Sequence, residues 1–433
     1  MAARNTLHKK LHRGFISRTT KRAAQEQWIQ ELKDTIALVT LEREADVLFA
    51  QWLSSETPLP EELNYLPKPQ VHEYAQLKEL WSRLEYISAS YQEVNLYTWG
   101  PRELEVNFHI QVKQPILFFY RYTGPFARDG QSNISLAVND KMLFESGWDE
   151  LSFFPEVLQE LTQLLQTTLS TTTLMWMILL ACDAQTSSDS GAGWEISDLL
   201  EAIDFDAPQQ APTPKSYARL NNNKPASFTI HLQQQLRSFD SRDKDGFKAC
   251  VENIESQIAQ LQLRRDADLL SSIWLGKRDI PSQPSSKMGF IQFPEPLPSG
   301  YRKELSRLWD TITYHSAVFR EVGLGNFDPR HIGVEFSFGT DVYVEYEYLG
   351  PVSRTAVPFV ELKADGKPLI ETKSGLCIRY DTLEGLRNSL QLDIPTHILL
   401  TFLLIACEGR YGESGGGYRE VKGILHQAQD ALT

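Results

Sequence analysis

The sequence predicts an α+β protein built from two tandem copies of one unit, each with two N-terminal helices, an antiparallel meander of about four strands and C-terminal helices. Three observations predict this fold. Segments of the first half recur in the second half in the same order, the apolar period changes from helical to alternating at the same place in both halves, and a segment rich in Pro, Gln and Asn separates them. We expect the two copies to pack about a pseudo-twofold axis.

The recurring segments match in residues that a shared periodicity does not require. ALVTLEREADVLFAQWL at 37–53 corresponds to AQLQLRRDADLLSSIWL at 259–275, and LKELWSRLEYISASYQEV at 77–94 corresponds to LSRLWDTITYHSAVFREV at 305–322. Farther along, YRYTGP corresponds to YEYLGP, and SGAGW corresponds to SGGGY. Two helices of similar amphipathicity would not share Trp, Gly-Pro and Ser-Gly at matched positions, so an internal duplication is the better explanation.

The domain boundaries follow from the segment between the copies. DFDAPQQAPTPKSYARLNNNKPAS at 204–227 lacks apolar periodicity and is typical of a linker. The first repeat is therefore predicted at 1–203 and the second at 228–433. The first 22 residues contain several Lys and Arg and no acid, which leaves a transit peptide as an alternative to a basic segment of the fold.

Helical spacing is clearest at the start of each copy. Residues 20–54 place Trp28, Leu32 and Trp52 on one face, and the second half repeats this pattern up to Trp274. A proline-rich turn, LPKP in the first copy and FPEP in the second, ends this helix because proline cannot donate the next helical hydrogen bond. The apolar stripe that follows predicts a second helix at 72–94.

The period then changes to two. LEVNFHIQV at 104–112, ILFFYRYTG at 116–124 and SNISLAVNDKMLF at 132–144 predict strands of a meander, and the second copy has their counterparts. Asp365-Gly366 predicts a tight hairpin turn. A single helix is expected to close each copy, at 155–181 and 383–406, before a Ser-Gly loop and a short last helix at 196–203 and 418–431.

Composition excludes several classes of protein. The formal net charge of −13 argues against a nucleic-acid surface, because phosphate binding requires clustered Lys and Arg. The apolar runs 174–182 and 398–407 are about half the ~20 residues that a membrane span needs, so we expect buried core helices and no membrane partner. The four cysteines show no CxxC spacing, and Cys182 and Cys407 are predicted to be buried thiols of a cytoplasmic protein.

The two Ser-Gly loops are the first candidate sites. Glycines after a helix allow a capping turn, and a glycine-rich loop that opens a helix can instead present backbone N–H groups to an anion. Both interpretations stay open. The second loop is the more polar. The candidate binding residues of the two loops are Ser190, Gly193, Trp194, Arg410, Tyr411, Glu413, Ser414 and Gly416.

Two arginines at matched positions are the second candidate. Arg102 and Arg330 each follow a proline at the start of the first predicted strand, and Glu93 and Glu321 precede them by nine residues. A structural Arg–Glu bridge between the preceding segment and the strand is one interpretation. The other is a pair of arginines that lines a central groove between the copies.

Catalytic and metal chemistry are not indicated. His8 and His12 share a helical face but lack a third ligand, and no GxSxG elbow is present. The alternating acids EREAD and RRDAD are typical of a surface helix, with Arg43 and Arg265 as local partners. We therefore expect no catalytic residue, no metal and no cofactor.

These observations favour a non-catalytic, intracellular protein-binding protein. Its acidity and pseudo-symmetric surface suit an immunity, inhibitor or defence-accessory protein that holds another protein, an inference by analogy rather than from a motif. One alternative is a sensor or enzyme for a small anionic ligand on the second Ser-Gly loop. Another is a structural subunit of a larger assembly.

Overall fold

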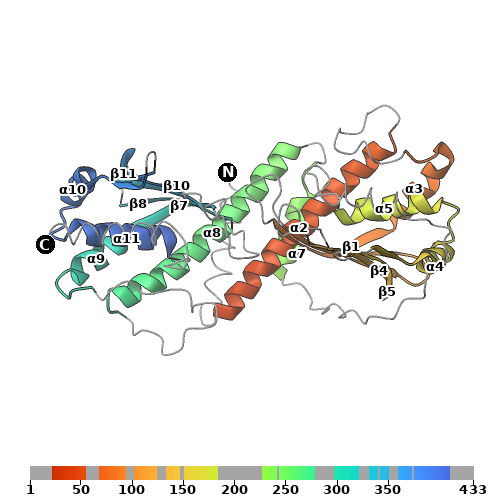
Figure 1. Ribbon diagram of the computed structural model, residues 1–433, viewed down its shortest axis with the longest axis horizontal. Coiled ribbons are helices and arrows are strands. Elements are labelled where there is room, and N and C mark those ends of the chain that lie inside the picture. Colours follow the sequence, from red (N-terminus) through yellow and green to blue (C-terminus); the bar gives the residue numbers. More distant parts are fainter. Residues whose placement is uncertain are drawn as a thin grey trace. The chain divides into compact units, whose positions relative to one another are not determined.

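The computed structural model contains two compact units, Lys21–Ala249 and Cys250–Thr433 (Figure 1). We name them the N-terminal unit and the C-terminal unit. The structure describes residues 22–54, 68–93, 102–123, 133–146, 151–183, 227–240, 243–277, 297–320, 331–339, 342–350, 359–372 and 375–409.

The N-terminal unit is an antiparallel sheet with helices before and after it. Its strands pair in sequence order from β1 to β6. In chain order the elements are α2 (Arg22–Trp52), η2 (Val71–Glu73), α3 (Tyr74–Ser82), β1 (Leu84–Glu93), β2 (Arg102–Ile110), β3 (Ile116–Thr123), β4 (Asn133–Val138), β5 (Lys141–Ser146), β6 (Leu151–Phe153), α4 (Pro155–Leu165), α5 (Thr171–Asp183) and α7 (Ser227–Arg237).

The C-terminal unit repeats this order. Its six strands also pair consecutively, from β7 to β12, and the division between the units falls inside α8. The elements are α8 (Lys244–Trp274), α9 (Arg302–Trp309), β7 (Ile312–Arg320), β8 (His331–Phe338), β9 (Val342–Leu349), β10 (Phe359–Ala364), β11 (Lys367–Glu371), β12 (Cys377–Ile378), α10 (Tyr380–Ser389) and α11 (Thr396–Glu408).

The α+β class with antiparallel sheets is confirmed, but two element predictions are wrong. The helix expected at 72–94 ends at Ser82, and the rest is strand β1, which pairs with β2 from Leu84 to Glu93. With β1 and the short strand β6 added, the first sheet has six strands where about four were expected, and the second sheet also has six. Ala89 is the single strong helix former in the segment YISASY, and the backbone partners that β2 supplies stabilise the extended form.

Each closing helix is in fact two helices. In the N-terminal unit the break follows Leu165, where Gln166 takes a left-handed conformation with φ 53°. In the C-terminal unit Gln391 has φ 54° and Pro395 precedes α11. A left-handed residue ends a helix because the next N–H group can then no longer continue the helical ladder. The short last helices expected at 196–203 and 418–431 lie outside the described residues.

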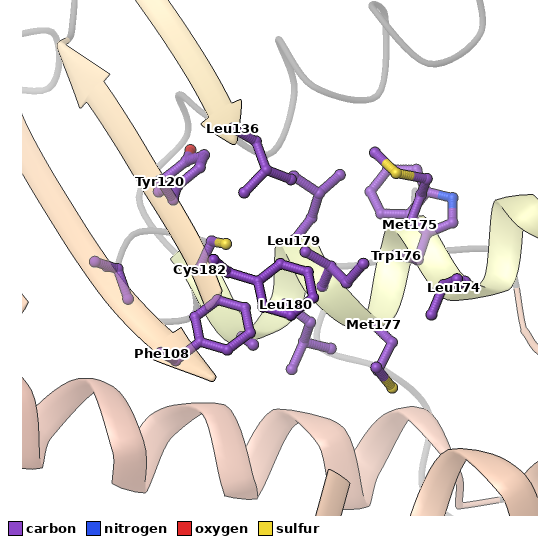
Figure 2. Packing of buried hydrophobic residues seen from close by; sticks show 14 of the residues in the cluster. Phe108, Tyr120, Leu136, Leu174, Met175, Trp176, Met177, Leu179, Leu180 and Cys182 are labelled. Atoms are coloured by element: carbon purple, nitrogen blue, oxygen red, sulfur yellow. The ribbon is translucent and has the colours of Figure 1, made fainter. Parts of the chain in front are cut away.

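One core fills each unit, on one face of its sheet. Helix α5 is buried along its length, and Figure 2 shows Leu179 and Cys182 turned toward side chains of the strands, among them Phe108, Tyr120 and Leu136. A helix that is apolar all round must be covered on all sides. Helices α5 and α11 are covered in this way by the sheet and the neighbouring helices of their own unit.

Two sequence predictions about the core are confirmed. The apolar runs 174–182 and 398–407 form buried helices, α5 and α11. The side chains of Cys182 and Cys407 are both buried, and neither forms a disulfide.

Unusual backbone conformations occur at matched positions in the two units. The hairpin turns Asn139-Asp140 and Asp365-Gly366 both have positive φ, as a two-residue turn of the primed type requires. The side chain of the first turn residue accepts a backbone N–H in each, from Leu117 to Asn139 Oδ1 at 2.9 Å and from Tyr343 to Asp365 Oδ1 at 2.8 Å. The predicted turn at Asp365-Gly366 is confirmed.

Hydrogen bonds explain why Trp and Asp recur at matched positions. Trp81 Nε1 donates to Asp46 Oδ1 at 2.8 Å, and Trp309 Nε1 donates to Asp268 Oδ1 at 2.9 Å. These bonds join the short helix before each sheet to the long helix α2 or α8. The acids at these two positions therefore have a structural role.

A second pair of matched bonds joins the sheet to the last core helix. Tyr86 OH donates to the carbonyl of Ala181, and Tyr314 OH donates to that of Ala406, both at 2.8 Å. Burial raises the pKa of both phenols well above the usual value, so both remain donors at neutral pH. Each bond satisfies a carbonyl in the last turn of a buried helix.

We predict that Tyr86→Phe and Tyr314→Phe each lower the free energy of unfolding by about 1–2 kcal/mol, because a buried carbonyl loses its donor. Urea denaturation checks this, with Tyr380→Phe at an exposed position as the control. An unchanged midpoint in either the Tyr86 or the Tyr314 variant would contradict the structural role of that bond.

Helix α7 packs against α2 in the N-terminal unit, although by sequence it lies beyond the predicted linker. The Arg43 guanidinium donates to the backbone carbonyls of Phe239 and Asp240, and it lies 4.7 Å from the centre of the Phe247 ring. Arg237 forms an ion pair with Glu42 at 2.9 Å. The linker lies outside the described residues, so the boundaries 1–203, 204–227 and 228–433 stay predictions.

Candidate interaction surface

The loop residues predicted from the sequence lie outside the described residues, as does one of the two arginines. Arg102 opens β2, and its backbone lies directly across from Glu93 at the end of β1, as the Arg–Glu interpretation requires. The side chains of both are not among those described, so their contact stays a prediction. The candidates that fall outside the described part are Ser190, Gly193, Trp194, Arg330, Arg410, Tyr411, Glu413, Ser414 and Gly416.

The prediction that the acids of RRDAD form a surface face is wrong at Asp266. Its side chain is buried and accepts two hydrogen bonds from the neighbouring Arg265, at 2.7 and 2.9 Å. The predicted local role of Arg265 is therefore confirmed, whereas Arg43 binds backbone carbonyls instead. Asp266 thus lies on the buried side of α8, not on a surface face.

Glu44, in the EREAD segment of α2 that matches RRDAD, has a carboxylate with a strongly raised pKa. Burial raises its pKa to about 7, although the charges of Lys244 and Arg43 act in the opposite direction. The neutral acid is thus favoured in the folded chain, whereas the unfolded chain ionises near the ordinary value of 4.5. The carboxylate therefore lowers stability as the pH rises from about 4.5 to 7.

We predict that Glu44→Gln raises the free energy of unfolding at pH 8 by about 1–3 kcal/mol, since the amide avoids the cost of a buried charge. Chemical denaturation at pH 5 and pH 8 checks this. The gain should shrink toward zero at pH 5, where the wild-type side chain is protonated in the folded state. Equal gains at both pH values would show that the effect does not come from the charge.

The face of the second sheet that points away from its core carries a set of carboxylates, which we call the acidic face. Along β8, β9 and β10, apolar residues enter the core at every second position, so the intervening side chains lie on the opposite face. The acidic face consists of Glu335, Glu345, Glu347 and Glu361.

The register of the strands places these carboxylates in like-charged pairs. Glu335 lies directly across from Glu345, and Glu347 lies directly across from Glu361. Like charges at directly opposed positions destabilise a sheet. Two cross-strand repulsions on one face are an arrangement that stability alone does not favour.

Two side chains offset part of this repulsion. The Lys363 ammonium lies 2.7 Å from Glu361, and the backbone register places Lys363 across from Glu345. His331 Nε2 lies 3.5 Å from Glu347, where it adds positive charge only when it is protonated. Among the described side chains, the four carboxylates lie beside one lysine, Lys363, and two histidines, His331 and His315, so this described part of the face keeps a negative excess.

Aromatic side chains border the acidic face. His315 stacks on Tyr343 with ring centres 5.7 Å apart, and Phe359 is 37% exposed. Burial raises the pKa of Tyr343 to about 12, and the hydrogen bond and charge of Glu335 act in the same direction. The face thus combines negative charge with flat, partly exposed rings, which is the composition of many binding surfaces.

The first sheet differs in charge on its corresponding face. There Glu105 lies across from Arg121, with which it forms an ion pair at 3.4 Å, and His109 lies 3.2 Å from Glu85. Opposite charges therefore face each other across β2 and β3, whereas Glu335 of β8 faces Glu345 of β9. The two sheets share a topology and differ in the electrostatics of the face that points away from the core.

Other kinds of site are not found in the part of the chain that the structure describes. No group of three or more His, Cys, Asp and Glu side chains there could hold a metal ion. Among the same residues, no helix has the length and apolarity needed to cross a membrane. No family model, curated protein or solved structure matches the chain.

Proposed function

We propose that the chain is a non-catalytic, cytoplasmic protein-binding protein of two diverged copies, and that the acidic face of the C-terminal unit holds a basic partner protein. The immunity or inhibitor role inferred from the sequence is one form of this function. The partner would contact mainly one copy, because the directly opposed carboxylates lie on the C-terminal unit.

The observation that carries this proposal is the pairing of Glu335 with Glu345 and of Glu347 with Glu361. Repulsion within the free protein is relieved when lysine or arginine side chains of a partner lie between the carboxylates. Complementary charge also raises the association rate, and more strongly at low salt. The exposed rings at the border supply the apolar contact that charge alone does not give.

The matched features of the two units support the duplication. The Trp–Asp bonds, the Tyr–carbonyl bonds and the left-handed glutamines recur at corresponding positions with the same geometry. Independent origin would require each of these to arise twice in the same order. The pseudo-twofold arrangement of the copies stays a hypothesis.

A double variant tests the proposed function. Glu335→Gln with Glu347→Gln removes one member of each like-charged pair and leaves Glu361 and Glu345 beside Lys363. We predict that this variant is as stable as the wild type or up to about 1 kcal/mol more stable. We also predict at least about tenfold weaker binding of the basic partner, mostly through slower association.

The partner is obtained by affinity purification from the source organism, with wild-type protein and the double variant as parallel baits. A basic protein retained by the wild type and lost with the variant is then purified and its binding measured at 50 and 300 mM salt. Glu105→Gln is the matched control, since it changes one carboxylate on the other sheet. Equal retention by both baits, an acidic partner, or no retained basic protein would each refute the proposal.

The two alternatives from the sequence also stay proposals. A small anionic ligand on the second Ser-Gly loop depends on Arg410, which lies outside the described residues. Gly409, where the described part of the C-terminal unit ends, packs so closely on α8 that an added Cβ would overlap Ala267. An assembly subunit would form large, concentration-dependent particles in light scattering.

A further inference from the structure

A pocket of about 390 Å³ opens in the C-terminal unit between α8, α9 and the start of β7. It is separate from the acidic face and does not depend on the proposed function. Its size is near the lower end of the range for small-molecule sites. The residues that line it are Arg264, Asp268, Ser271, Ser272, Lys277, Trp309, Asp310, Ile312 and Tyr314.

The pocket is lined by two cations and two carboxylates, and only one cation and one carboxylate form an ion pair with each other. Arg264 lies 3.8 Å from Asp268, which also accepts the Trp309 hydrogen bond. Within the described part of the chain, Lys277 and Asp310 have no ion-pair partner. A polyanion such as a nucleotide would meet two carboxylates, whereas a molecule with one positive and one negative group would match both remaining charges.

Helix ends hold these two charged residues in place. Gly276, with φ 69°, ends α8, and the next N–H, that of Lys277, returns to the Ser272 carbonyl at 2.8 Å. Asp310 ends α9, where its N–H donates to the carbonyl of Ser306. Both backbones are thus fixed beside the pocket, and only the side chains must order around a ligand.

The N-terminal unit has the same frame with different side chains at the matched positions. Its matched positions keep the Trp–Asp and Tyr–carbonyl bonds, but Glu42 stands for Arg264 and Ser82 stands for Asp310. Phe49 stands for the first serine of the lining and stacks on Trp81 with ring centres 4.1 Å apart and planes 5° from parallel. In the N-terminal unit, an aromatic ring of the protein itself thus packs on Trp81, the counterpart of Trp309.

In the C-terminal unit the tryptophan has a different contact. Phe402 of α11 meets Trp309 edge-on, with ring centres 5.3 Å apart and planes at 83°. The short side chains of Ser271 and Ser272 on α8 leave room for the pocket. A planar group can pack against the part of Trp309 that lines it.

We propose that this pocket binds a small zwitterionic molecule with a planar ring, of the size of a single aromatic amino acid. The Lys277 ammonium binds the ligand carboxylate, the Asp310 carboxylate binds the ligand ammonium, and the ring packs against Trp309. The N-terminal unit, with Glu42 and Ser82 at matched positions, does not bind this ligand.

The test uses L-phenylalanine at 1–10 mM with the full chain, followed by thermal denaturation and calorimetry. The expected result is a rise in Tm of about 2 °C or more. 3-Phenylpropionate and phenethylamine, which keep the ring and one charge each, should bind at least about tenfold more weakly. Inorganic phosphate and AMP should give no rise.

Lys277→Gln and Asp310→Asn should each remove the shift, and Lys248→Gln, at an exposed position on α8, should retain it. Far-UV circular dichroism and an unchanged Tm without ligand establish that the variants fold. The proposal is overturned if phenylalanine gives no shift, if phosphate or AMP alone gives one, or if both pocket variants bind as the wild type does. The acidic-face double variant should bind phenylalanine normally, so failure here is independent of partner binding.

Discussion

Burial of one sheet face under α5 and α11 is the constraint on which each unit depends. Both helices are apolar all round, so they cannot lie on the surface and must be enclosed by the sheet and the long helix. Strand alternation then determines which residues face water, because neighbouring side chains point to opposite sides. The tyrosine bonds to Ala181 and Ala406 complete this packing by satisfying carbonyls that the helix leaves over.

Patterns confined to a few residues made part of the fold predictable. The long helices, the alternating strands and the Asp365-Gly366 turn follow from periodicity and turn chemistry. Strand β1 could not be predicted in this way, because Leu80, Leu84 and Ile87 have spacings that also suit a helix. The backbone pairing with β2 makes this segment a strand. The helix breaks at Gln166 and Gln391 could not be predicted either, because glutamine does not require the left-handed conformation that both residues adopt.

The sequence predicts which single carboxylates of the acidic face point away from the core, but not which of them lie opposite one another. The alternation in VYVEYEYL places Glu345 and Glu347 opposite the core, and this is visible in the sequence. Their partners, Glu335 and Glu361, come from other strands, so the like-charged pairs exist only through the register of three strands. Single-sequence patterns carry no register between distant segments, so local motifs such as the Ser-Gly loops stand out in the sequence while this face does not.

The two units keep their frame and differ in their chemistry. Residues that hold a helix to a sheet, such as Trp309 and Tyr314, have matched counterparts with the same hydrogen bonds. Residues that point to water or into the pocket do not, as at Arg264, Asp310 and the acidic face. Under the proposed duplication, drift alone would be expected to remove directly opposed carboxylates, because relief of like-charge repulsion stabilises a sheet. Their presence together on one unit therefore supports a binding role for the C-terminal unit.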